Sequence, residues 1–314
     1  MAETEARAFN GTANLGRILR DVATGEFDDL AARNWMSIHI PTSYYIGAVY
    51  LATVFMIKFW MQNRKAFELK TPLIFWNGFQ SGFSILVVLN TLPDLVYQGY
   101  TGVMGYEEDP TKILWNALCT STFLQGSLGA WHFVFCLSKT VELIDTYFIV
   151  LRKKPLIFLH YYHHLATMLI GYTAFAHAGG IVRATTVVNS SVHAVMYGYY
   201  FLNSINVRLP GWIARNITRM QIVQFMAGAA AMAYLTVEYF VDRGCEMDTY
   251  MMVFCWIIDV TYLGLFLNFF HQSYVAGGGK AKYQTEEQKK TLPPSLSNIC
   301  VADLGKPEEK EKDD

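Results

Sequence analysis

Long apolar stretches, each about as long as a bilayer is thick, constrain the fold of this chain more than any other feature. A transmembrane helix needs about 20 consecutive, mostly apolar residues. Windows that meet this requirement lie at 42–62, 73–96, 128–150, 157–176, 184–204, 218–239 and 250–271. Only 16% of the residues are charged, against roughly 25% in a soluble domain. The sequence therefore predicts an all-α polytopic membrane protein with seven transmembrane helices.

The third window is the least regular, because 114–150 is one long stretch. Its second part, from Ser138 to Val150, is too short to cross a bilayer alone. We therefore expect one helix over 128–150, preceded by a segment that lies at the membrane interface.

Basic residues between the predicted spans indicate how the chain is oriented. The first, third and fifth loops, with the helix ends beside them, carry ten Lys and Arg residues, whereas the second, fourth and sixth carry only Lys112, Arg183 and Arg243. Because cytosolic loops carry an excess of Lys and Arg, the odd loops are predicted to face the cytosol. The N-terminus would then be lumenal and the C-terminus cytosolic.

Short signals at both termini agree with this orientation. Asn10 begins an Asn-Gly-Thr glycosylation sequon on the predicted lumenal side. Lys310 and Lys312 near the C-terminus match a dilysine retrieval signal of the endoplasmic reticulum, although a solvated charged tail is the alternative. We expect a lumenal N-terminal segment over 1–40, a seven-helix membrane domain with the candidate catalytic groups over 41–275, and a disordered cytosolic tail over 276–314.

The cysteines give no framework for the fold. Their irregular spacing contains no CxxC pair, so we expect buried or unpaired thiols and no zinc motif. The five positions are Cys119, Cys136, Cys245, Cys255 and Cys300.

Four polar clusters interrupt the predicted spans, where ionisable side chains are costly and usually mark function. Within each cluster the residues recur three or four apart, so they share one helical face. In chain order the clusters are Lys139, Glu142, Asp145 and Thr146; His160, His163 and His164; Asn189, His193, Tyr197 and Tyr200; and Gln221 and Gln224. Contacts that merely pin helices together are the alternative, above all for the first and last clusters. Because all four overlap in the predicted cytosolic half, we expect one pocket that opens toward the cytosol.

Three imidazoles on one helical face are consistent with either a metal site or metal-free catalysis. Neutral imidazole binds zinc or iron, but the chain has a single histidine box, and the glutamate of a zinc protease motif is absent. Histidine also acts as a nucleophile and exchanges protons near neutral pH. Acyl transfer from a thioester therefore fits these residues, and we expect neither a metal nor a bound cofactor.

Basic residues at the predicted cytosolic helix ends are suited to holding the phosphates of a carrier such as coenzyme A. The positive-inside bias explains any one of them equally well. They are Arg152, Lys153, Lys154, Arg215 and Arg219.

The polar clusters match four motifs in order. They fit KxxExxDT from Lys139, HxxHH from His160, NxxxHxxMYxYY from Asn189 and TxxQxxQ from Thr218. Over about residues 35–275 the chain resembles the ELO family of very-long-chain fatty-acid elongases of the endoplasmic reticulum membrane. The resemblance implies seven helices, of which the last six enclose an acyl-chain tunnel that is closed at one end.

The resemblance also implies 3-ketoacyl-CoA synthase activity, in which a long-chain acyl-CoA condenses with malonyl-CoA. Separate reductases and a dehydratase would process the product. The sequence leaves the oligomeric state open, with a homo- or hetero-oligomer as one alternative, and no nucleic acid is expected as a partner. The stretches 64–69 and 156–159 resemble members that act on saturated and monounsaturated chains.

The stripe geometry suggests a two-stage reaction. We expect His163 to attack the acyl thioester, while His193 and either His160 or His164 move protons and stabilise the enolate. The groups expected to orient these histidines are Glu142, Asp145, Asn189, Tyr197, Gln221 and Gln224, and those expected to support the site or bind substrate are Lys139, Thr146 and Tyr200.

Two other functions remain open on sequence grounds. A seven-helix transporter or receptor for a lipid has the same helix count and a polar pocket at membrane depth. A histidine-box metal oxidase is the second alternative. A transporter would return its substrate unchanged, and an oxidase would contain iron and consume oxygen.

Overall fold

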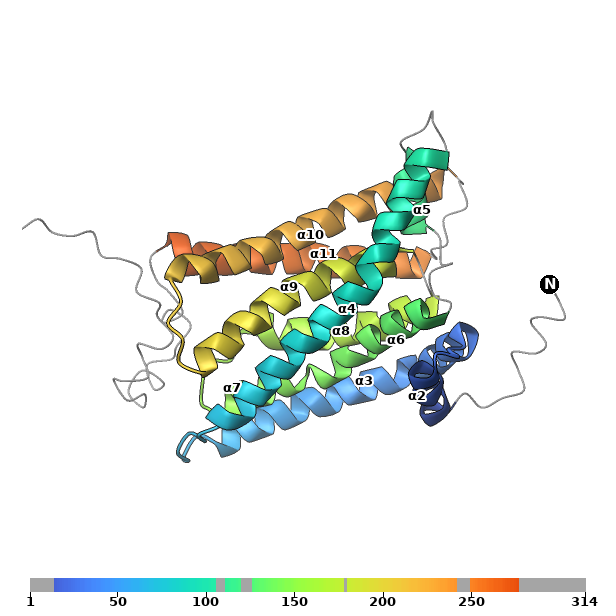
Figure 1. The fold of residues 1–314 in the computed structure, drawn as a ribbon. Helices are drawn as coiled ribbons and strands as arrows, with labels where there is room; N and C mark the ends of the chain where they lie inside the picture. Colours follow the sequence, from blue (N-terminus) through green and yellow to red (C-terminus); the bar gives the residue numbers. More distant parts are fainter. Residues whose placement is uncertain (1–13, 106–110, 120–125, 178–179, 242–248, 277–314) are drawn as a thin grey trace, which may run out of the picture.

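A computed structural model describes residues 14–105, 111–119, 126–177, 180–241 and 249–276, and every regular element in these ranges is helical (Figure 1). This confirms the predicted all-α class. The elements are α2 (Leu15–Thr24), α3 (Asp29–Trp60), α4 (Lys70–Gly105), α5 (Thr111–Cys119), α6 (Gly126–Val141), α7 (Ile144–Leu151), α8 (Phe158–His177), α9 (Ile181–Ser204), α10 (Gly211–Phe240), α11 (Thr249–Phe270) and the π-helical turn η2 (His271–Val275). Asn10, Cys245, Cys300 and the predicted tail from residue 277 onward lie outside the described residues.

Within the ranges that the structure describes, four helices are long and apolar enough to cross a membrane. They are found at Asp29–Trp60, Lys70–Tyr97, Gly211–Phe240 and Thr249–Val275. The chain is therefore a multi-pass membrane protein. The windows at 157–176 and 184–204 coincide with α8 and α9, which run through the same bundle. A total of seven spans stays a prediction.

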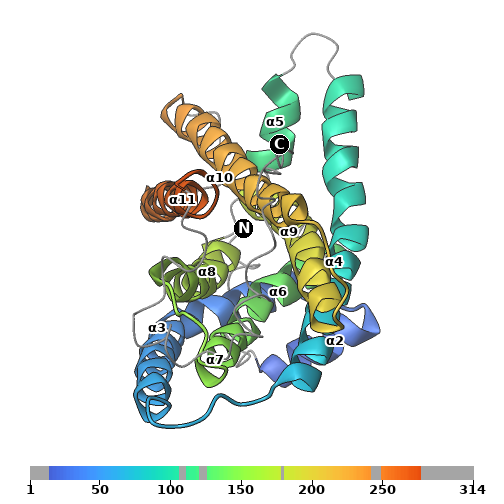
Figure 2. The same ribbon diagram turned by 90° about the vertical axis from the view of Figure 1, so that its left-hand side faces the viewer.

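The neighbours of each helix define the bundle. Figure 2 looks onto the predicted cytosolic end, where α8 lies between α3 and α11, and α9 lies between α4 and α10. Helices α10 and α11 pack on each other, and α6 packs on α4, α8 and α9. Gly171 of α8 permits a close approach of α6, since a Cβ there would lie 3.0 Å from the carbonyl oxygen of Cys136.

Buried apolar side chains hold this arrangement together. Burial of apolar surface away from water is favourable, and so is close packing of side chains between the helices. One cluster joins α2, α3, α6 and α8 and includes Trp35, Phe133 and Phe175. Another joins α8, α10 and α11 through Phe225 and Phe266. The predicted membrane domain begins at residue 41, but α3 already begins at Asp29 and continues through this position without a break. Side chains of α2 and of the start of α3 also belong to the first cluster.

The predicted helix over 128–150 is not continuous. Helix α6 ends at Val141 and α7 begins at Ile144. The amide of Asp145 donates to the carbonyl of Glu142 at 3.1 Å, a three-residue step instead of the four-residue step of an α-helix. This tighter turn divides the predicted single helix, but side chains three residues apart, such as Glu142 and Asp145, still lie on the same side of such a turn. The segment expected to lie at the interface before this helix contains α5.

Arg183 is not a loop charge, although the charge count treats it as one. It lies in the first turn of α9 with 0% of its surface exposed. Its Nε is 2.9 Å from the carboxylate of Asp94 on α4, and its Nη1 donates to the carbonyl of Ala117 on α5 at 3.3 Å. Counting basic residues cannot separate a buried ion pair from a solvated loop charge.

The expectation of unpaired thiols is wrong for Cys119, which is disulfide-bonded at the end of α5. It holds for Cys136 and Cys255, whose buried thiols form no disulfide. Spacing along a chain does not reveal which cysteines meet in space.

Candidate active site

Lys139 is buried in the last turn of α6, where its ammonium group connects two helices. Nζ donates to the carboxylate of Glu142 at 2.7 Å and to the side-chain oxygen of Asn189 on α9 at 3.0 Å. Lys139 is 5% exposed and Glu142 is 3% exposed. Because an isolated buried charge is very costly, each of these groups requires the other.

Glu142 carries this network onward to His193. Its second carboxylate oxygen lies 3.8 Å from Nδ1 of His193 on α9, which is longer than a hydrogen bond. His193 is buried one turn beyond Asn189 and one turn before Tyr197, and its ring lies 5.5 Å from that of Tyr197. The predicted stripe along α9 is therefore confirmed as a geometric feature.

Asp145, in the first turn of α7, is a second point of convergence. Its carboxylate accepts a hydrogen bond from Trp76 Nε1 of α4 and another from the Tyr197 hydroxyl, both at 2.5 Å. Nε2 of His164 lies 3.9 Å from the same carboxylate. Hydrogen bonds to a charged acceptor are the strong class, so this carboxylate fixes α4, α7 and α9 relative to one another.

Thr146 anchors His160. Its hydroxyl lies 2.7 Å from the Tyr50 hydroxyl of α3 and 3.1 Å from Nε2 of His160. The rings of His160 and His164 are 4.4 Å apart. Two of the three histidines in the box are therefore positioned by residues of α7.

His163 has different surroundings. The centre of its ring lies 5.0 Å from that of Tyr262 and 6.1 Å from that of Phe266, both on α11. It is half-buried, and within the described part of the chain its imidazole makes no hydrogen bond. The centre of its ring lies 5.4 Å from that of His164. Both of its ring nitrogens therefore remain available to a substrate.

The glutamines of α10 lie at the edge of this network. Gln224 accepts from the Asn189 amide at 3.5 Å, at the limit of a hydrogen bond. Gln221 donates to the sulfur of Met196 at 3.3 Å, and no histidine contact is seen for it among the described residues. Tyr200 is 40% exposed and contacts the ring of Tyr197 at 6.3 Å.

The five basic residues of the predicted rim fall into two groups. Arg152, Lys153 and Lys154 follow α7, and Lys153 donates to the carbonyls of Gln62 and Arg64 at 3.0 and 3.1 Å. Lys153 thereby holds the connection between α3 and α4. The other group is on α10, where Arg215 lies over Tyr274 and Arg219 bonds the side chain of Asn216 at 3.0 Å.

Three residues that contact the site were not predicted from the sequence: Tyr50, Trp76 and Tyr262. Each is an aromatic residue with a polar tip inside an apolar window, which is the one available signal. The chain has 19 Tyr and 7 Trp residues, so this signal does not single them out. Among the described residues no three His, Cys, Asp or Glu side chains are grouped as metal ligands.

This arrangement places the half-buried imidazole of His163 beside two carboxylates and an ammonium group that are held by hydrogen bonds, and beside three further histidines. Of these three, His160 is hydrogen-bonded to Thr146, while His164 and His193 lie 3.9 and 3.8 Å from a carboxylate. Such a site is suited to nucleophilic attack and proton transfer, since orienting groups hold the histidines while one ring meets the substrate.

Comparison with known proteins places the chain in a family. Residues 35–282 match the sequence model of a protein family that is described as "ELO: GNS1/SUR4 family". The chain is 38% identical over 265 residues to "Long chain fatty acid elongase 1" of Caenorhabditis elegans, covering 84% of this chain and 89% of the relative. It is 36% identical over 252 residues to "Very long chain fatty acid elongase 3" of Homo sapiens, covering 78% and 87%.

Proposed function

This chain belongs to the ELO family of fatty-acid elongases, and we propose that it is the condensing enzyme of the elongation cycle, a 3-oxoacyl-CoA synthase. Its substrates would be a long-chain acyl-CoA and malonyl-CoA. The observation that supports this most directly is the available imidazole of His163 beside the ordered network around Glu142 and Asp145. The substrate chain would be saturated or monounsaturated.

The first stage would transfer the acyl group to the protein. A nitrogen of His163 attacks the thioester carbonyl carbon, the carbon–sulfur bond breaks, and coenzyme A leaves as a thiolate. The proton lost from the attacking imidazole goes to that thiolate through a neighbouring histidine. The product of this stage is an acyl-imidazole and free coenzyme A.

The second stage would form the new carbon–carbon bond. Malonyl-CoA loses its free carboxylate as CO2, and the electron pair of the broken bond forms an enolate. The enolate carbon attacks the acyl-imidazole carbonyl, and the carbon–nitrogen bond to His163 breaks. Over both stages one proton is consumed, and a 3-oxoacyl-CoA, CO2 and coenzyme A are formed.

The neighbouring groups have separate roles in this proposal. Glu142 would orient His193, which is positioned to polarise the malonyl thioester and stabilise the enolate. Asp145 and Thr146 would orient His164 and His160 for proton transfer. The basic residues near α7 and α10 would hold the phosphates of coenzyme A. Neither a metal nor another cofactor is required for these steps.

The protein would reside in the endoplasmic reticulum membrane, with its N-terminus in the lumen, its C-terminus in the cytosol, and the reductases and dehydratase of the cycle as partners. The disulfide at Cys119 supports this orientation. Cys119 ends α5, on the predicted lumenal side, and disulfides persist in oxidising compartments such as the lumen of this organelle.

The direct test incubates the purified protein in detergent with palmitoyl-CoA and radiolabelled malonyl-CoA. We expect labelled 3-oxo product from the parent and from His177→Ala, a control on the exposed end of α8, but not from His163→Ala. With palmitoyl-CoA alone, the parent should release one equivalent of coenzyme A and gain one acyl group. If a folded parent makes no product with any acyl-CoA, the elongase proposal is wrong and the transporter alternative is favoured. Product formation without an acylated protein would exclude the covalent stage.

A further inference from the structure

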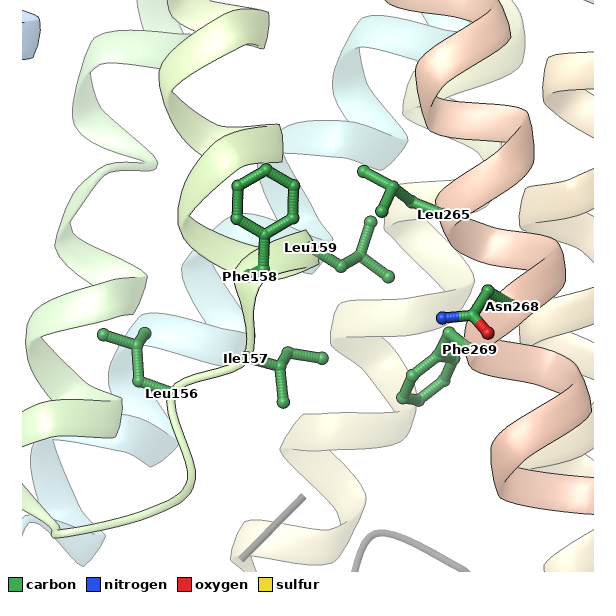
Figure 3. Close-up of a pocket in the computed structure, with 7 residues that line it drawn as sticks. All are labelled: Leu156, Ile157, Phe158, Leu159, Leu265, Asn268 and Phe269. Atoms are coloured by element: carbon green, nitrogen blue, oxygen red, sulfur yellow. The ribbon is translucent and has the colours of Figure 1, made fainter. Parts of the chain in front are cut away.

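An apolar cavity of about 300 Å³ lies between the start of α8 and the end of α11. From α8 it is lined by Phe158 and Leu159, and from α11 by Leu265, Asn268 and Phe269 (Figure 3). Leu159 and Leu265 point toward each other across the seam between the helices, and the amide of Asn268 points toward α8. The lining is therefore hydrocarbon with a single hydrogen-bonding group.

The cavity lies on the same seam as His163. Leu159 precedes His163 by four residues, which is about one turn of α8. On the other side, Leu265 is followed by Phe266, whose ring is 6.1 Å from the His163 ring. The cavity therefore adjoins the one histidine of the box whose imidazole is available.

Hydrogen bonds fasten the deeper part of this seam. The hydroxyl of Tyr162 lies 2.9 Å from that of Thr261, and Tyr262 donates to the backbone carbonyl of His163 at 3.0 Å. Both lie further from the predicted cytosolic end than the cavity does. Around the cavity the facing side chains are mainly leucine and phenylalanine, and such contacts are non-directional and separate without loss of a hydrogen bond.

We propose that this cavity is a lateral port through which the acyl chain of the thioester passes between the bilayer and His163. The proposal rests on the proposed function. Helix α11 is long and apolar enough to cross a membrane, and Phe158, which lines the cavity, is 52% exposed. An exposed apolar side chain on a membrane-spanning bundle is expected to face lipid. The occupant is a long saturated or monounsaturated acyl chain, whose thioester carbonyl can accept a hydrogen bond from Asn268.

Lateral passage avoids an unfavourable route. An acyl chain that left the bilayer to enter from the cytosol would expose its apolar surface to water, which is unfavourable in proportion to the exposed area. Through the α8–α11 seam the chain meets mainly leucine and phenylalanine side chains, with the amide of Asn268 beside them, and its carbonyl end arrives beside His163. The basic residues that follow α7 adjoin the same loop, where the coenzyme A phosphates would remain in the cytosol.

The first test fills the port with Leu265→Trp. The control is Leu267→Trp, at a side chain of the same helix that is 48% exposed. With palmitoyl-CoA, we expect Leu265→Trp to lower kcat roughly tenfold, because passage of the acyl chain becomes limiting. The KM of this variant for malonyl-CoA should stay near the parent value. The activity of Leu267→Trp should also stay near that of the parent. The deficit should shrink with decanoyl-CoA. An equal loss with both acyl lengths would indicate a displaced His163 and overturn the port, as would no loss at all.

The second test needs no variant, so it remains decisive if Leu265→Trp does not fold. Palmitoyl-CoA with a diazirine in its chain is photolysed on the parent protein in phosphatidylcholine vesicles, and the labelled peptides are identified. Labelling at 156–159 or 265–269 that unlabelled palmitoyl-CoA displaces is expected. Labelling confined to other segments would overturn the proposal. A parallel experiment uses phosphatidylcholine that carries the diazirine. If only this probe labels the port, and palmitoyl-CoA does not displace it, the proposal is also wrong. Condensation by the parent, measured separately, reports on the proposed function itself.

Discussion

The phenol of Tyr197 donates a 2.5 Å hydrogen bond to the carboxylate of Asp145, and this contact joins α9, which carries His193, to α7, which anchors the histidine box. Tyr197 is 3% exposed, so water cannot replace the bond. The contact therefore couples the position of His193 to that of His160 and His164 across two helices. It joins two polar stripes that the sequence predicts to share one pocket, through a pairing that the spacing alone does not specify.

Tyr197→Phe tests this coupling directly. The change removes a hydrogen bond to a charged acceptor and leaves Trp76 as a remaining donor, so we expect a loss of about 1.5–3 kcal/mol in the free energy of unfolding. Condensation should fall even in the folded fraction, because His193 and the box are no longer held in register. Tyr199→Phe, which alters a neighbouring phenol on α9, is the matched control. Thermal unfolding in detergent and product formation per folded protein check both variants, and equal behaviour of the two would contradict the coupling.

Lys139→Met tests whether the buried ion pair holds the site together. Methionine nearly preserves the length of the side chain but leaves the Glu142 carboxylate buried with no cation, which costs about 3–5 kcal/mol. Adding Glu142→Gln removes the orphaned charge, so the double variant should regain most of the stability. It should not regain activity, because His193 loses its carboxylate neighbour. Recovery of condensation in the double variant would show that Glu142 acts only on stability.

Thr146→Val and Tyr50→Phe separate anchoring from structure. Tyr50→Phe removes only the hydrogen bond between these two hydroxyls, whereas Thr146→Val also removes the partner of His160. Each lost hydrogen bond should cost about 0.5–1.5 kcal/mol in stability. We expect condensation to fall in Thr146→Val and not in Tyr50→Phe, because only the first change removes the hydrogen bond that orients His160. A pH profile of kcat that differs from the parent in Thr146→Val but not in Tyr50→Phe would identify the effect as positional.

The sequence was informative where a pattern repeats along the chain and uninformative where two distant residues meet. Hydropathy located the long helices, and the three- and four-residue spacing placed His193 and Tyr197 on one face of α9. A periodicity averaged over 23 residues could not reveal the two-residue break between α6 and α7. Trp76 was not identifiable either, because an aromatic residue in an apolar window looks the same whether it meets lipid or Asp145. Pairings of this kind depend on tertiary packing alone.

Arg183→Met tests the opposite end of the bundle, where the buried guanidinium pairs with Asp94 and bonds the last turns of α5. Removing the cation leaves the Asp94 carboxylate only 17% exposed and unpaired, so the free energy of unfolding should fall by about 3–5 kcal/mol. Helix α5 and the first turn of α9 should also become more accessible to hydrogen exchange, since the bond that joins them is lost. The combination with Asp94→Asn should restore part of the stability. The KM for malonyl-CoA should stay at the parent value in the folded protein, because Arg183 lies in the first turn of α9, about 15 Å along the helix axis from His193. A changed KM would show that this ion pair, and not only the groups near the predicted cytosolic side, controls the geometry of the candidate active site.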